Sequence, residues 1–191
     1  MDGKLFERQI TKAEIESGIE NVLDSPKDQG TLAMIVRRPK IGKREVVDEG
    51  ILDSGLGLLG DNWLTRGSSR TTDGKGHPEM QLNLMNIRFA ELIAGNRSRV
   101  PLAGDQLYID LDLCSENLPP GTILAIGTAL IEVTSIPHLG CKKFVERFGM
   151  DAMMFANSDF GRQHNLRGVN ARVVIGGKIA VGNRVIKAPS A

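Results

Sequence analysis

Short β patterns separated by glycine-marked turns limit the fold of this chain more than any other feature. A Gly-Thr turn at residues 127–128 separates two apolar runs, and the pair Gly176-Gly177 predicts a hairpin further on. Many short strands joined by tight turns are typical of a β-barrel or a β-sandwich. Strand patterns occupy residues 31–36, 43–48, 106–112, 122–126, 129–134, 173–175 and 178–186.

Two helices are expected around these strands, in addition to a short one between Cys141 and Gly149. Residues 11–23 place apolar residues on one helical face, and Thr11 and Glu14 have the spacing of a capping box. Residues 82–93 carry a helical apolar stripe that stops at Gly95. We predict an N-terminal helix and linker (residues 1–30), a main domain (31–187) and a short tail (188–191).

Composition excludes several classes of function. The 24 basic and 23 acidic residues nearly balance, and one Trp and one Tyr offer few stacking platforms, so nucleic-acid binding is not expected. No apolar run is long enough to span a bilayer, and residues 1–10 are charged where a secretory signal would be apolar. We therefore expect a cytoplasmic protein that does not bind membranes.

One cysteine stands out chemically. Cys141 follows Pro137 and Gly140 and precedes a short helical pattern that ends at Gly149, which places the thiol at the first turn of a helix. The helix dipole, Lys142, Lys143, Arg147 and His138 favour the thiolate form there. A thiolate can act as a nucleophile, a sulfur carrier or a soft-metal ligand. The alternative is an inert core cysteine.

The remaining sites are less specific. Cys114 and Cys141 lack the close spacing of a zinc site, although a disulfide between them stays open. The glycine-rich residues 53–63 match neither the Walker pattern nor the dinucleotide fingerprint. Residues 66–78 are polar and predict a surface loop, in which His77 is expected to be solvated.

Five segments, in their order along the chain, resemble the MOSC family, named for the C-terminal domain of molybdenum cofactor sulfurases. The likeness covers roughly residues 31–187. Residues 68–78 depart from the family pattern, where many relatives have a His-Gly-Gly type segment. The resembling segments are Gly55-Leu-Gly-Leu-Leu-Gly-Asp61, Cys114-Ser-Glu-Asn-Leu118, Ile126-Gly-Thr-Ala-Leu-Ile-Glu-Val-Thr134, Gly140-Cys-Lys-Lys-Phe-Val-Glu-Arg-Phe-Gly149 and Arg167-Gly-Val-Asn-Ala-Arg-Val-Val174.

The resemblance implies a mainly β fold, a barrel with peripheral helices, in which Cys141 ligates molybdenum or carries persulfide sulfur. It also implies the molybdenum cofactor, a pyranopterin dithiolene whose phosphate arginines can hold. We expect Asp61 to stabilise its loop or to orient a substrate or an arginine. The residues expected to contact the cofactor are Arg167, Asn170, Arg172, Lys142, Lys143, Glu116 and Asn117.

Several functions follow from this resemblance. The first is a cofactor-binding or sulfur-carrier protein, and the second is a molybdenum-dependent reductase of N-hydroxylated compounds. The third is a non-catalytic module that binds a small anion or a partner protein through the same basic site. A sulfur donor or an electron-transfer protein would be the partner, because the chain has neither a cysteine desulfurase domain nor a redox domain; a small-molecule substrate and a homodimer are also compatible with the sequence.

Overall fold

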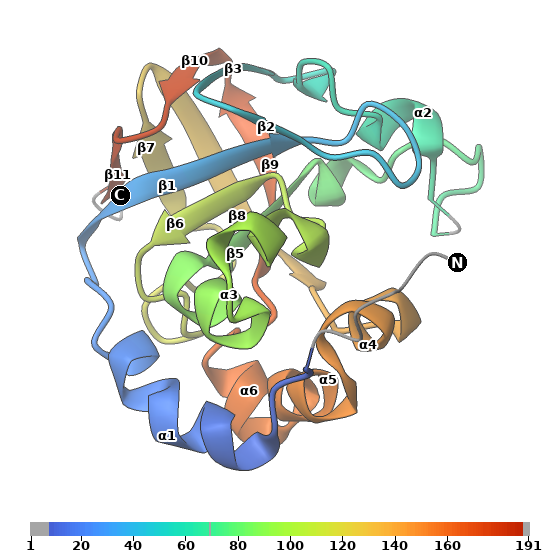
Figure 1. The fold of residues 1–191 in the computed structure, drawn as a ribbon. Coiled ribbons are helices and arrows are strands. Elements are labelled where there is room, and N and C mark those ends of the chain that lie inside the picture. The colour runs from blue at the N-terminus through green and yellow to red at the C-terminus, as the bar shows by residue number, and fades with distance from the viewer. Residues whose placement is uncertain (1–7, 69, 189–191) are drawn as a thin grey trace.

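The computed structural model describes residues 8–68 and 70–188, and its centre is a closed β-barrel (Figure 1). Seven strands form the barrel in the order β1-β11-β7-β8-β9-β5-β6, and β6 pairs with β1 again. Only the β5–β6 pairing within this barrel is parallel. The predicted mainly β fold is confirmed. The strands are β1 (Gln29–Arg37), β5 (Leu82–Asn86), β6 (Leu107–Asp110), β7 (Ile123–Ile126), β8 (Ala129–Pro137), β9 (Val169–Ile175) and β11 (Arg184–Lys187).

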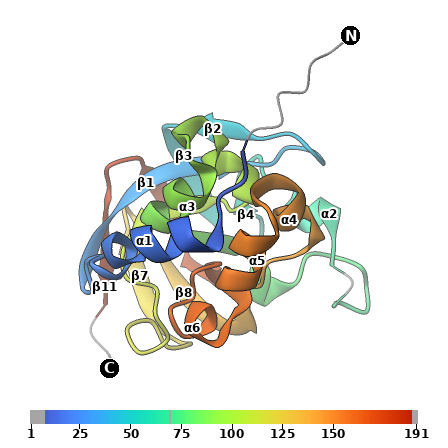
Figure 2. The same ribbon diagram turned by 60° about the horizontal axis from the view of Figure 1, so that its bottom comes forward.

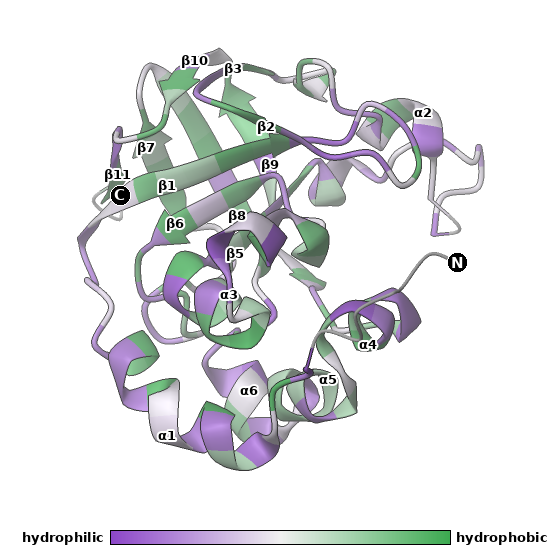
Figure 3. Cartoon of the chain, in the orientation of Figure 1, coloured by the Kyte–Doolittle hydropathy of each residue, from purple (hydrophilic) through white to green (hydrophobic). Residues whose placement is uncertain are grey.

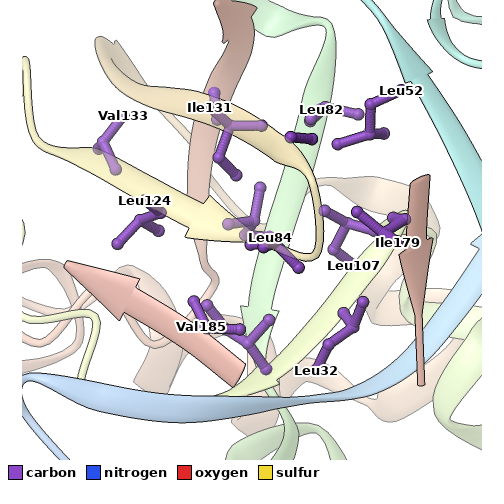
Figure 4. Packing of buried hydrophobic residues seen from close by; sticks show 14 of the residues in the cluster. Leu32, Leu52, Leu82, Leu84, Leu107, Leu124, Ile131, Val133, Ile179 and Val185 are labelled. Atoms are coloured by element: carbon purple, nitrogen blue, oxygen red, sulfur yellow. The ribbon is translucent and has the colours of Figure 1, made fainter. Parts of the chain in front are cut away.

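Aliphatic side chains fill the interior of the barrel. Leu32, Leu84, Leu107 and Val185 come from four different strands and have no exposed surface. Figure 4 shows them gathered between the strands. Leucine, isoleucine and valine suit a barrel of this size, because side chains must fill its interior completely.

A small second sheet lies beside the barrel. It consists of β3 (Glu49–Asp53), β4 (Gly57–Leu58) and β10 (Gly177–Ala180), while β2 (Glu45–Val47) extends from β1. The hairpin predicted at Gly176-Gly177 is wrong, because β10 pairs with β3 and not with β9. A Cβ on Gly177 would lie 2.5 Å from Thr128 Oγ1. This glycine therefore permits a close crossing of the chain from one sheet to the other.

Two other predicted elements are each divided in two. Residues 82–93 form β5 and then α3 (Ile87–Ala94), and Asn86, the last residue of β5, is also the N-cap of the helix. All five residues of β5 are buried, and two of them, Leu82 and Met85, also have the spacing of a helical stripe. Residues 178–186 form β10 and β11, which a turn at Gly182 (φ +87°) separates.

Helices cover one side of the barrel (Figure 2). The predicted N-terminal helix is α1 (Lys12–Leu23), its capping box is present, and it packs on α3 and α5 through the buried Ile15 and Val22. In Figure 3 the barrel strands are largely hydrophobic, whereas α1 and α4 also carry hydrophilic residues. The other helices are α2 (Trp63–Arg66), η1 (Pro78–Met80), η2 (Arg97–Ala103), α4 (Lys142–Phe148), α5 (Met150–Asn157) and α6 (Asp159–Gln163).

None of the helices among residues 8–68 and 70–188 is both long and apolar enough to cross a membrane.

Candidate functional site

A cavity of about 430 Å³ lies between α2, the polar segment that follows it, and α4, and we call it the basic cavity. Its lining includes eight basic side chains and Cys141. No aspartate or glutamate lines it among the described residues. The basic side chains are those of Arg38, Lys40, Arg44, Arg66, Arg70, Lys143, Arg147 and Arg167.

Cys141 lies where the sequence predicts it, directly before the first residue of α4. It is exposed, and its thiol makes no capping hydrogen bond, so Sγ is not used to terminate the helix. Asn157 of α5 fixes Gly140, the residue before Cys141, since the Asn157 side-chain amide accepts from Gly140 N (2.8 Å) and donates to Gly140 O (3.1 Å). Cys114 is also free, so the two thiols form no disulfide.

Arg38 is held rigidly in the cavity wall. Its Nε donates to Asp61 Oδ2 (2.8 Å) and its Nη2 donates to Asp61 Oδ1 (2.9 Å). Nη1 donates to Asn83 Oδ1 (3.0 Å) and to Gly104 O (2.7 Å). The side chain of Asp61 has no exposed surface, so this buried carboxylate orients an arginine, which is one of the roles expected for it.

Arg167 is fixed by a second buried carboxylate. Its Nη1 lies 2.9 Å and 2.8 Å from the two oxygens of Asp105, and its Nη2 donates to Ala103 O (3.0 Å). The guanidinium carbon lies 4.9 Å from the ring centre of Phe144 in α4. Arg167 therefore joins the segments that precede β9 and β6 to the helix that begins beside Cys141.

His138 completes this network, because its Nε2 lies 2.7 Å from Asp105 Oδ1. Burial alone would raise the pKa of Asp105, but Arg167 and His138 outweigh it and hold this pKa well below its usual range. Burial, and after it Arg167, lowers the pKa of His138. His138 is therefore neutral at pH 7, and its Nε2–H donates to Asp105.

Positive charge in the cavity exceeds the negative charge around it. Burial, followed by Arg147 and Arg38, lowers the pKa of Arg44, and burial followed by Arg38 lowers the pKa of Arg66. Within the described residues, neither guanidinium forms an ion pair. Such a concentration of cations stabilises a bound anion.

Buried polar atoms without partners also occur around the basic cavity. Arg44 Nε, Trp63 Nε1 and Arg167 Nε are donors, and Asn62 Oδ1 is an acceptor. Their hydrogen bonds are unmade in the part of the chain that the structure describes. Buried polar groups are normally satisfied, so these four unpaired atoms in the cavity lining are exceptions.

Only some of the residues predicted to contact the cofactor line the basic cavity. Arg167 and Lys143 line the basic cavity with Cys141, whereas Lys142 is not part of the lining. Asn170 is fully buried behind it, where its Oδ1 accepts from Asn83 Nδ2 (2.6 Å).

The structure does not bring the other predicted contacts to the cavity. Arg172 lies on β9 and pairs with Glu132 (2.7 Å). Asn117 donates to Lys27 O and Asp112 O, so it stabilises a loop elsewhere, and the neighbouring Glu116 is exposed.

Sequence reasoning missed five of the eight basic side chains, Lys40 among them. Arg38, Arg44, Arg66 and Arg70 come from segments far from Cys141, and no spacing rule connects them. Residues 66–78, which the sequence predicts to be a surface loop, contribute Arg66, Arg70 and His77 to the cavity lining. The available signal was the density of arginines on both sides of the glycine-rich loop.

No protein-family model matches this chain, and no curated protein matches it. Solved structures do. YuaD from Bacillus subtilis has a TM-score of 0.64 at 13% identity, covering 85% of this chain and 97% of that one. YiiM from Escherichia coli has a TM-score of 0.53 at 23% identity, with 84% and 71% covered.

YiiM from Geobacillus stearothermophilus gives a similar match, with a TM-score of 0.54 at 17% identity over 84% of this chain and 75% of that chain. Likeness at such identity concerns the fold and leaves activity open. Together with the motif order, these structures support a MOSC-like β-barrel fold for this chain.

Proposed function

We propose that this protein binds the molybdenum cofactor in the basic cavity, with Cys141 as a ligand of the metal. The observation that supports the proposal is the convergence of one exposed thiol and eight basic side chains on one cavity. A phosphate-bearing cofactor needs the cations, and a thiophilic metal needs the thiolate.

The cavity fits such a group in size and charge. Its volume of about 430 Å³ is within the range of small-molecule sites, and Arg44 and Arg66 have no carboxylate partner among the described residues. A phosphate beside these guanidinium groups would receive charge-assisted hydrogen bonds. Trp63 Nε1 and Asn62 Oδ1 offer a donor and an acceptor to a heterocycle.

The donor set also fits a metal that brings other ligands with it. Among the described residues, no group of three or more His, Cys, Asp and Glu side chains is arranged to hold a metal ion. A metal bound through Cys141 would therefore take its remaining ligands from the dithiolene and from solvent. When bound, this cofactor would supply a metal centre that exchanges two electrons.

The residues of this chain orient the group. Arg38 and Arg167 each keep one geometry because a buried carboxylate, Asp61 or Asp105, holds them. The packing of Phe144 against Arg167 links that geometry to the helix after Cys141. Preorganised donors of this kind lose little entropy when an anion binds.

Persulfide carriage is a second candidate function, and the exposure of Cys141 favours it. A carrier sulfur must be reached by a donor protein and then by an acceptor, and the thiol of Cys141 is exposed. The same cations would stabilise the anionic terminal sulfur.

The test is elemental and pterin analysis of protein from a host that makes the cofactor. We expect molybdenum and pterin in the parent and loss of the metal in Cys141→Ser. Cys114→Ser is the matched control, because this second free thiol does not line the basic cavity and should leave the metal content unchanged.

The outcomes separate the alternatives. Metal that Cys141→Ser retains would contradict the assignment of the ligand. A parent without metal, but with one extra sulfur on Cys141 by mass spectrometry, would favour carriage. Turnover of N-hydroxylated bases by the loaded protein with an electron donor would identify a reductase, and failure of all three measurements would leave an anion-binding module.

A further inference from the structure

A second cavity, of about 330 Å³, lies on the other side of Arg167 and His138. These two side chains line both cavities, so the buried Asp105 network is a shared wall. We call this space the rear cavity. Neither the motifs nor the proposed function gives it a role.

The lining of the rear cavity is more apolar than polar, although Thr134, Ser135 and Asn165 also belong to it. Leu118, Val133, Ile136 and Val169 contribute to its lining from a loop and from strands β8 and β9. Its volume is at the small end of the range for ligand sites, so it suits a compact apolar body.

Charge is concentrated on one residue of this lining. The charge of Arg167 is met by Asp105, and His138 is neutral. Arg162 is exposed, its Nε donates to Asn157 O (2.8 Å), and it has no ion pair among the described residues. Because no acidic side chain in the described lining opposes it, the cavity carries one unmatched positive charge at its exposed edge.

We propose that the rear cavity binds a small monoanion with an apolar body, of the aryl or branched-chain carboxylate class, whose carboxylate pairs with Arg162. The apolar lining removes the hydrocarbon part from water, and the single cation selects the charge. Arg167 Nε is buried without a partner in the described chain, and Arg167 belongs to the wall that the two cavities share. The proposal does not depend on a bound metal cofactor.

Titration calorimetry of the full chain with three probes tests the charge selection. The probes are 2-naphthoate, the neutral 2-naphthamide and the cationic 2-naphthylmethylamine. We expect saturable binding of naphthoate, about tenfold weaker binding of the amide, and no binding of the amine. Arg162→Gln should weaken naphthoate binding by about tenfold, whereas Arg162→Lys should keep most of the affinity because it keeps the charge.

Blocking variants test the location. Ser135 and Leu139 both line the rear cavity and are exposed, so Ser135→Trp and Leu139→Trp should fill it without disturbing the core. Both should abolish naphthoate binding, while Ser135→Ala binds as the parent does. Inorganic phosphate, as a probe of the basic cavity, should bind equally to all of them.

Three results would overturn the proposal: no naphthoate binding to the parent at millimolar concentration, equal binding of acid and amine, or unchanged binding in both tryptophan variants. The unfolding midpoint of each tryptophan variant is compared with that of the parent. If one variant is clearly less stable, the other is used for the binding comparison. A parent protein that binds naphthoate but does not bind phosphate would count against the proposed function and not against the rear cavity.

Discussion

Asp105→Asn should be one of the most destabilising conservative substitutions in this protein. The Asp105 carboxylate has no exposed surface, accepts from Arg167 Nη1 through both oxygens, and accepts from His138 Nε2. The neutral amide leaves the Arg167 guanidinium buried without a counter-charge, and removing one partner of a buried pair costs about 3–5 kcal/mol.

Urea unfolding at pH 7 measures this loss as a lower midpoint at an unchanged slope. Asp110→Asn is the matched control: Asp110 pairs with Arg88 at 2.7 Å, but its side chain is 32% exposed, so the loss should be about 1 kcal/mol or less. Adding Arg167→Met to Asp105→Asn should recover part of the stability, because the uncompensated charge is then gone.

The same substitution predicts a change in pH dependence. The folded pKa of Asp105 is below its unfolded value of about 3.9, so its stabilisation is complete above about pH 5. It is lost as the pH falls toward the folded pKa. The parent should therefore lose more stability than Asp105→Asn between pH 5 and pH 3; a loss below about 1 kcal/mol at pH 7, or parallel pH profiles, would refute the reasoning.

Three further predictions follow from single sites. Gly168→Ala should lower the free energy of unfolding by about 2–3 kcal/mol, because φ is +110° and a Cβ would lie 2.1 Å from a backbone oxygen. Gly182→Ala is the control, because φ is +87° but the space around it is open, and it should cost about 1 kcal/mol. Equal losses in thermal or urea unfolding would contradict the clash. Arg44→Gln should weaken phosphate binding by about tenfold in calorimetry, while the exposed, paired Arg172→Gln should not. The NMR titration midpoint of His138 should fall below about 6.5, and a midpoint above that value would contradict its neutral state.

The sequence allowed most of the strands, the turn at residues 127–128 and the position of Cys141 to be predicted, because each depends on local pattern, but it did not predict β3, β4 or β5. The turn joins β7 to β8 directly, with Ile126 opposite Ala129. Periodicity failed at residues 82–86, because Leu82 and Met85 have the spacing of a helical stripe although both lie in β5. It also failed at Gly177, whose role depends on contact with Thr128, some fifty residues away in the chain.

The wall of the basic cavity could not be predicted for a similar reason. In the sequence, Arg38 and Arg167 cannot be distinguished from surface arginines, because no neighbouring residue indicates that a buried carboxylate binds them. Asp61 and Asp105 are 23 and 62 residues away from their partners. Only the closed barrel brings these charges together.

The pairing of β1 with β11 has a consequence for how the chain folds. Gln29 lies opposite Ile186, and Gln29 is hydrogen-bonded to Arg184, a residue 155 positions later. During synthesis, residues 184–187 leave the ribosome after all the other strands, so the barrel cannot close until translation has passed them. Until then the edges of β1 and β7 are unpaired, and the nascent chain exposes two strand edges to other chains.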